Sequence, residues 1–136
     1  MARFVATDYA VTFGTTNFSS LVASVTLEFT AEEQDVTAFG TAGFRERIAG
    51  LKDGSLSVDF HQDFAVGSVD QYFWSQLGSV VSVTLKPTSG TVTSSNPSYS
   101  GSVLITGWSP LASSVGDLAT VSVSYPTSGV WIRATA

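Results

Sequence analysis

Residues 35–60 read DVTAFGTAGFRERIAGLKDGSLSVDF, and this stretch decides the fold. An alternating segment, TLEFT at residues 26–30, comes before it, and a second one, GSLSVDF at residues 54–60, ends it. A hairpin that only reverses the chain uses about two to five residues, whereas this excursion takes roughly 15 to 20. Loops of that length in compact domains are usually functional or disordered. Its apolar residues argue against a solvated linker, so we expect the excursion to lie on another surface.

The composition predicts a single domain over residues 1–136. The 136 residues are 43% hydrophobic and only 12% charged, which is enough to bury a core without disulfides or metals. Typical domains are about 25% charged, so here Ser and Thr supply much of the polarity. A surface poor in Lys and Glu is weakly protected against association, and we therefore expect other subunits to cover much of it.

The charge balance argues against nucleic-acid binding. There are 11 acidic and 6 basic residues, a net charge of −5, and no Lys or Arg cluster of the kind that holds phosphates. The chain would repel DNA. This excludes a protein that binds DNA but not a protein that forms a surface past which DNA moves. It has no cysteine, no run near the ~20 apolar residues of a membrane span, and no visible secretory signal.

Alternation of apolar and polar residues predicts an all-β sandwich or barrel with one short packed helix. A capping-box pattern at Ser68 and Gln71 starts the expected helix, Phe73 and Leu77 should pack on a sheet, and Gly78 should end it. The continuously apolar strand at residues 80–85 should be covered on both faces. Strands are expected at residues 9–13, 22–30, 55–61, 80–85, 102–108, 119–125 and 130–135, with a PTSG turn between the last two.

The chain offers little for catalysis. His61, the single histidine, lies between Asp59 and Asp63, so a carboxylate–imidazole pair or a weak metal site is conceivable. A specific zinc site usually needs three or more protein ligands, and a solvated strand face explains these residues better. No serine lies in a nucleophile elbow, and no glycine-rich nucleotide motif is present. We predict no enzymatic activity, no metal and no cofactor.

Two groups of residues leave alternatives open. An acidic run is either a solvated strand end or a charged rim facing a channel or a neighbour's arginines, with paired glycosidase carboxylates as a weaker interpretation. It consists of Glu28, Glu32, Glu33 and Asp35, and the arginines would be Arg45 and Arg47. The aromatic residues are either core or a carbohydrate platform, and these are Trp74, Trp108, Trp131, Tyr99 and Tyr125.

From about residue 21 onward the chain resembles the tail tube, or major tail, proteins of long-tailed bacteriophages. The resemblance lies in the order and spacing of its elements. The hairpin LVASVTLEFTAEEQDVTAFG…GFRERIAGLKDGSLSVDF is followed by the helix QYFWSQLG and the strands VSVTLKP, SGSVLITGW and DLATVSVSYPTSGVWIRATA. The most telling pieces are AGLKDGSLSVDF and ITGWSPLASSVGDLATVSVSYPTSG.

The resemblance implies a β-sandwich subunit that forms hexameric rings stacked into a tube, through which the genome passes without specific binding. Its partners would be further copies of itself and other tail proteins such as tape measure, terminator and distal tail proteins, with no membrane. Its location would be the virion tail, assembled in the host cytoplasm. The alternatives are a tail terminator, a capsid decoration subunit or, less favoured, a carbohydrate-binding β-sandwich.

Two sets of site residues follow. The long loop between the second and third strands would reach the adjacent ring, and its contacts would be Phe39, Phe44, Arg45, Glu46, Arg47, Ile48 and Leu51. Strand alternation assigns one polar face to a negatively charged lumen, because short hydroxyls and carboxylates give phosphates nothing to hold. The lumen candidates are Thr26, Glu28, Ser57, Asp59, His61, Ser122 and Ser124.

Overall fold

Antiparallel strands are the main regular structure of the computed structural model, which describes residues 3–136. The strands lie in the order β2-β1-β5-β6-β7-β4-β3. The predicted fold class, all-β with one short helix, is confirmed. The elements are β1 (Ala10–Phe13), β2 (Thr16–Asn17), a 3₁₀ turn (Ser19–Leu21), β3 (Val22–Asp35), β4 (Arg47–His61), α1 (Val69–Ser75), β5 (Val80–Lys86), β6 (Ser98–Leu104) and β7 (Thr120–Ala134).

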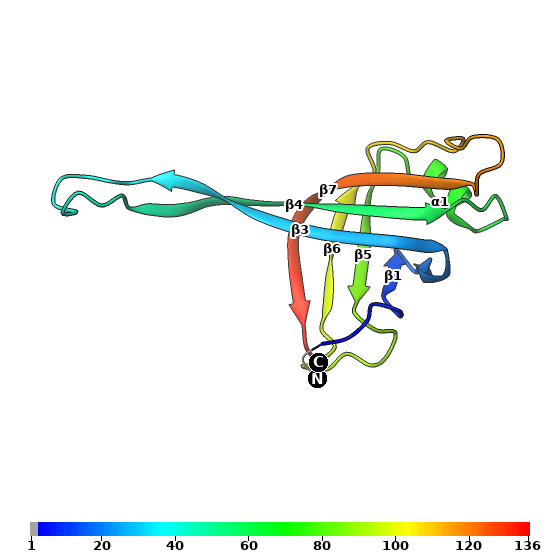
Figure 1. The fold of residues 1–136 in the computed structure, drawn as a ribbon, viewed down its shortest axis with the longest axis horizontal. Helices are drawn as coiled ribbons and strands as arrows, with labels where there is room; N and C mark the ends of the chain where they lie inside the picture. The colour runs from blue at the N-terminus through cyan, green and yellow to red at the C-terminus, as the bar shows by residue number, and fades with distance from the viewer. Residues whose placement is uncertain (1–2) are drawn as a thin grey trace.

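Strand β7 joins two sheets. Its first half pairs with β4 up to Pro126, and its second half pairs with β6 from Thr127 onward. In Figure 1, β3, β4 and the first half of β7 run across the view, while β1, β5, β6 and the second half of β7 run down it. Strands that bend from one sheet into another make the corners of orthogonal sandwiches. The predicted PTSG turn is therefore wrong: residues 126–129 bend a continuous strand, with Gly129 at a φ of 84°.

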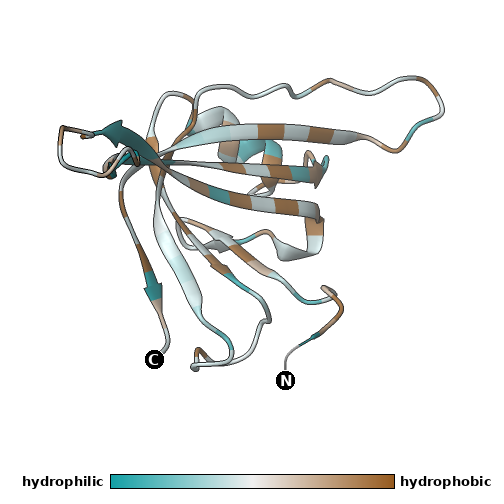
Figure 2. Ribbon diagram, turned by 60° about the vertical axis from the view of Figure 1, so that its left-hand side comes forward, coloured by the Kyte–Doolittle hydropathy of each residue, from teal (hydrophilic) through white to brown (hydrophobic). Residues whose placement is uncertain are grey.

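The core lies between the two sheets, and α1 closes one end of it. The predicted alternation in β4 is confirmed, because Leu56, Val58 and Phe60 are buried. Figure 2 shows the corresponding alternation of hydrophobic and hydrophilic bands along the strands. Phe73 of α1 is fully buried, with its ring 5.3 Å from that of Phe60 and stacked 4.9 Å from that of Trp108. An aromatic cluster thus fixes the helix on the sheets.

Several local predictions need correction. The Ser68 hydroxyl does not cap α1 but donates a hydrogen bond to Asp63 Oδ2 at 2.8 Å. Leu77 lies beyond the helix and is 48% exposed, because α1 already ends at Ser75, although Gly78 has the expected left-handed φ of 84°. Strand β5 is buried on one face only, since Val80 is exposed. Strand β6 spans residues 98–104 rather than 102–108.

The long excursion is mostly paired strand. β3 and β4 continue beyond the body of the protein and stay in register through the pair formed by Asp35 and Arg47. Within the projecting part, a register shift between Ala31 and Glu33 interrupts the ladder once. Figure 1 shows the resulting two-stranded ribbon projecting far from the sandwich. We call residues 30–53 the arm and residues 36–46, the only part outside the strands, its tip.

Candidate functional site

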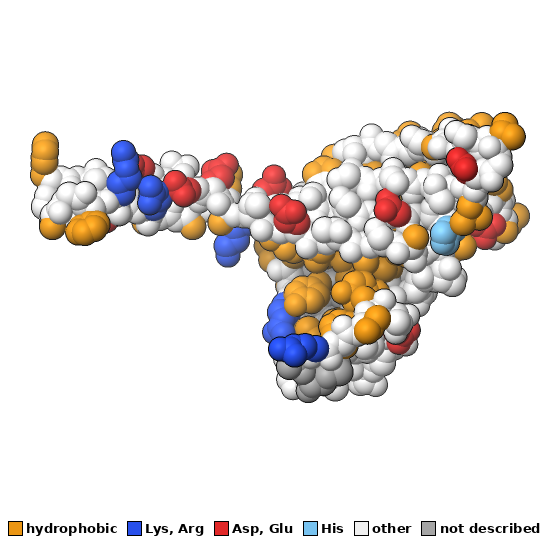
Figure 3. Space-filling view, viewed as in Figure 1, with side chains coloured by type: hydrophobic (Ala, Val, Ile, Leu, Met, Phe, Trp, Pro, Cys, Tyr) orange, Lys and Arg blue, Asp and Glu red, His pale blue; other side chains and the backbone are white. Residues whose placement is uncertain are grey.

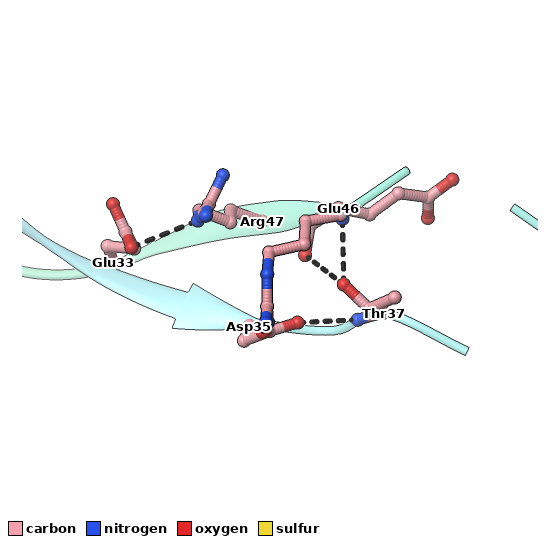
Figure 4. Close-up of polar contacts among 6 residues, drawn as sticks. Glu33, Asp35, Thr37, Glu46 and Arg47 are labelled. Carbon is pink, nitrogen blue, oxygen red and sulfur yellow. Dashed lines mark hydrogen bonds and ion pairs between the residues drawn. The ribbon is translucent and has the colours of Figure 1, made fainter. Parts of the chain in front are cut away.

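Short polar contacts hold the arm together near its tip (Figure 4). Arg45 Nη1 lies 2.8 Å from Asp35 Oδ2, and Arg47 Nε lies 3.0 Å from Glu33 Oε1. The Glu46 N–H donates to Thr37 Oγ1 at 2.8 Å. Hydrogen bonds from Thr37 lower the pKa of Asp35, and Arg45 adds to this effect. Two acids of the acidic run, Glu33 and Asp35, thus pair with arginines of their own arm.

The surface of the arm is unusually apolar for a projecting ribbon. All seven residues predicted as inter-ring contacts lie on it and are exposed. Phe39 at the tip is completely exposed, and Phe44 and Leu51 are each 76% exposed. Exposed apolar side chains grouped on one segment mark an interaction site. Their role between rings stays a prediction.

The backbone of the tip turns tightly and uses left-handed φ values. Gly40 and Gly43 have φ values of 99° and 82°, and Ala42 between them has a φ of 55°. Ala42 is the one non-glycine residue with positive φ in the described part of the chain. A left-handed alanine costs roughly 1–2 kcal/mol, which the neighbouring glycines avoid.

The seven lumen candidates share one face of the sheet formed by β3, β4 and the first half of β7. Thr26, Ser57 and Ser124 lie side by side across the three strands, and the Ser57 hydroxyl donates to that of Ser124 at 3.2 Å. In the next row, the Ser24 hydroxyl donates to Asp59 Oδ2 at 3.0 Å. All seven residues therefore lie on a single polar face. That this face lines a lumen stays a prediction.

This polar face carries negative charge and no positive charge. Its acids are Glu28, Asp53 and Asp59, and none of the residues in its cross-strand rows is Lys or Arg. Lys52 points to the opposite face, since neighbouring strand residues alternate. Figure 3 shows this side of the body as mostly uncharged polar surface with acidic side chains and the histidine.

One ring nitrogen of His61 has no partner. His61 Nδ1 is buried and makes no hydrogen bond in the described part of the chain, so this atom does not pair with Asp59 or Asp63. Residues 3–136 contain no group of three or more His, Cys, Asp or Glu side chains placed to hold a metal ion. None of the helices found in those residues is long and apolar enough to cross a membrane.

Two edges of this sheet are unpaired. β3 ends the strand order, and the first half of β7 pairs with β4 on one side only, within the described residues. Residues 22–30 of β3 contain neither Lys nor Pro, the residues that usually protect an edge. Both edges could therefore accept a strand from another molecule.

A groove lies between the base of the arm and the second half of β7. Its volume is about 650 Å³, and we call it the arm-base groove. The Phe29 ring meets the Trp131 ring edge-on at 5.6 Å, and Arg133 Nε donates to the Tyr99 hydroxyl at 3.2 Å. Its lining includes Phe29, Lys52, Asp53, Tyr99, Trp131, Ile132 and Arg133.

Sequence reasoning missed this groove because its residues come from four strands. The signal that could have found it is a pair of glycines opposite aromatic rings. A Cβ on Gly54 would lie 2.4 Å from the Phe29 ring, and one on Gly101 would lie 2.4 Å from the Trp131 ring. Which glycine faces which ring depends on strand register, and the sequence does not give the register across distant strands.

The aromatic residues do not form one carbohydrate platform. Trp108 stacks on Phe73, and Tyr125 is buried in the core. Trp74 is 65% exposed on α1, away from Tyr99 and Trp131 in the groove. Most of the five therefore serve separate structural roles.

Comparison with known proteins identifies the fold. No protein-family model matches the chain, and no curated protein matches it. A chain in the virion of a native gene transfer agent particle superposes with a TM-score of 0.73 at 19% identity, covering 93% of this chain and 95% of that chain. A chain in the tail of an empty gene transfer agent particle, with C6 symmetry, gives 0.65 at 24% identity, covering 85% and 83%. These similarities confirm the expected tail-type fold.

Proposed function

We propose that this chain is the subunit of a virion tail tube, which forms hexameric rings that stack end to end around passing DNA. The observation that carries the proposal is the arm, whose exposed apolar residues have no cover within the described chain. The fold shared with a chain of a C6-symmetric tail supports the same assembly. The proposed role is structural and involves no catalysis and no cofactor.

Ring closure would use the two unpaired sheet edges. The free edge of β3 on one subunit would pair with the free edge of β7, at residues 120–126, on the next subunit. Such a contact joins two different surfaces of identical molecules, and it closes into a ring when the rotation between neighbours divides a full turn. Backbone pairing would also remove the aggregation risk of exposed edges.

The polar face would then line the lumen. Its hydroxyl rows and the acids Glu28, Asp53 and Asp59 give a surface that repels phosphates and offers no Lys or Arg to hold them. DNA could slide along such a wall. In a complete tail the tube would also meet the tape measure, terminator and distal tail proteins.

The first test is electron microscopy of the purified protein at increasing concentration, with sedimentation to measure mass. We expect rings that join into tubes. A species that stays monomeric at high concentration, with the arm intact, contradicts the proposal. Single rings that never stack would instead favour a tail terminator.

A second test shortens the arm. Replacing residues 37–45 by Asn-Gly joins Val36 to Glu46 through a two-residue turn, because the Val36 N–H already donates to the Glu46 carbonyl at 2.9 Å. We expect an unchanged circular dichroism spectrum and rings that no longer stack. The matched control replaces only Phe39 by Tyr, which keeps an aromatic tip. Normal tubes from the shortened variant would show that the arm does not join rings.

A further inference from the structure

We propose that the arm-base groove receives the arm tip of a second copy of this chain, with an aromatic side chain of the tip in the groove. This inference rests on the proposed function, because it names the surface that the arm would contact in the next ring. Phe39 and Phe44 are the aromatic side chains of the tip.

The groove is apolar and only partly covered. Phe29 is 46% exposed and Ile132 is 60% exposed, while Trp131 is partly buried between them and β6. Figure 3 shows hydrophobic side chains gathered below the base of the arm, with Lys and Arg beside them. The volume of about 650 Å³ is enough to enclose a large side chain. Exposed aromatic and aliphatic residues around a recess are typical of sites that bind an anchor from a partner.

The groove has a net positive charge, because its lining holds Lys52 and Arg133 against the single acid Asp53, and the tip offers a carboxylate. Lys52 makes no ion pair within residues 3–136, and Arg133 contacts the Tyr99 hydroxyl rather than a carboxylate. On the tip, Arg45 is already paired with Asp35, which leaves the Glu46 carboxylate as the uncompensated charge. Figure 4 shows the Glu46 side chain pointing away from both ion pairs. Docking would therefore bring an unpaired carboxylate toward two unpaired cations.

The arm is long enough for its tip to reach a neighbouring molecule. The same length keeps the tip away from the groove of its own chain. Phe39 lies ten residues beyond Phe29, or about 33 Å along an extended strand, so the tip cannot fold back while the ribbon stays paired. The part of β4 in the body, residues 54–61, spans about 23 Å before the loops that follow it. When the loops that follow β4 are included, the body extends about as far along this direction as the arm does (Figure 1). A copy displaced by one body length along the arm would place its groove beside the tip.

The groove also offers backbone hydrogen-bonding groups. The second half of β7 pairs with β6 on one side, and no strand of the described residues pairs with its other side. This free edge runs along the groove through Val130 and Ile132. A tip in the groove could accept and donate hydrogen bonds there, which would fix its position along the strand.

Cross-linking tests the contact directly, because the chain has no native cysteine. Ala38→Cys on the tip and Val130→Cys in the groove are prepared as separate proteins, mixed, assembled and oxidised. We expect covalent dimers at least ten-fold above a control mixture of Ala38→Cys with Ser75→Cys, which lies on α1. Equal yields in both mixtures would overturn the proposal. Dimers of Val130→Cys with itself would also overturn it, because they would place two grooves face to face.

A charge exchange tests the ionic part. Glu46→Lys alone and Lys52→Glu alone should each raise the concentration needed for tube formation about ten-fold. The double variant carries both changes and should return to within about three-fold of the unmodified protein. Failure of this rescue would remove Lys52 as the partner of Glu46. If the unmodified protein forms tubes but neither test succeeds, the groove assignment fails and the tube function stands. If it forms no rings, the proposed function itself fails.

Discussion

At the scale of single residues, Tyr125 links the core to the loop before β7. Its ring is 1% exposed, and its hydroxyl donates to the Gly107 carbonyl at 2.7 Å. Burial raises the pKa of Tyr125 well above the ordinary tyrosine value, because ionisation would leave a charge in the core. The unfolded chain ionises near pH 10. Stability from this residue is therefore complete below about pH 10 and is lost as the pH rises further.

Tyr125→Phe tests this dependence. The variant keeps the buried ring but loses the hydrogen bond, so we expect the free energy of unfolding to fall by about 0.5–1.5 kcal/mol at pH 7. At pH 11 the difference from the unmodified protein should shrink or change sign, because phenylalanine cannot ionise. Urea unfolding at both pH values measures it. Tyr9→Phe, at a residue 42% exposed, serves as the control. A difference that is equal at both pH values would contradict the burial argument.

Face assignments at single residues could be predicted from the sequence, whereas capping contacts could not. The alternation of Leu56 and Val58 with Ser57 needs only the two-residue period of a strand. Ser68 fits the capping pattern, yet its hydroxyl bonds Asp63, five residues earlier. A serine hydroxyl donates a hydrogen bond to whichever acceptor lies near it in the folded loop. The sequence pattern does not identify that acceptor.

At the scale of elements, the contact of β6 with β7 depends on a glycine beneath an indole ring. The Trp131 ring lies over Gly101, and its Nε1–H donates to the Ser102 carbonyl at 3.1 Å. The register of this strand pair shifts between Ser100 and Ser102. A side chain at residue 101 would push the indole out of its place and disturb both the ladder and the groove.

Gly101→Ala should therefore destabilise the protein by about 1–3 kcal/mol, the usual cost of overpacking a well-filled site. Gly107→Ala is the matched control, because a Cβ there would meet no atom within 4 Å. Thermal unfolding of the two variants gives the comparison, and tryptophan fluorescence reports the movement of the indole. An equal loss of stability in both would mean that backbone freedom, rather than the indole, is responsible.

Element types could be predicted from the sequence, but their continuity could not. The strands of the arm alternate poorly, since Gly50 and Leu51 fall where the register shifts, and a composition rich in Gly and Ala resembles a loop. Pro126 and Gly129 are typical of a turn that reverses the chain. Here they instead lie where one continuous strand bends from one sheet into the other. In both cases long-range pairing overrides the local turn preference.

At the scale of the whole molecule, the surfaces divide into a polar face, two free edges and an apolar arm. The sequence could predict the face and the exposed arm because both follow from alternation and composition. The groove that would receive a partner could not be predicted, since it is made by Phe29, Tyr99 and Trp131 from distant strands. In the proposed assembly, a subunit whose donor and acceptor surfaces differ in this way would join copies head to tail and give stacks with a direction.

The same division predicts which face reagents can reach after assembly. Ser124→Cys places a thiol on the polar face, and Ser75→Cys places one on α1, on the core side of the same sheet. In separate subunits both thiols should react with a maleimide carrying a long polymer. In long tubes Ser124→Cys should react at least ten-fold more slowly with that reagent than with a small maleimide, because the polymer cannot pass along a narrow lumen. Ser75→Cys should show no such dependence on reagent size. A Ser124→Cys thiol that the polymer reaches equally well in tubes would place the polar face outside the tube and contradict its assignment to the lumen.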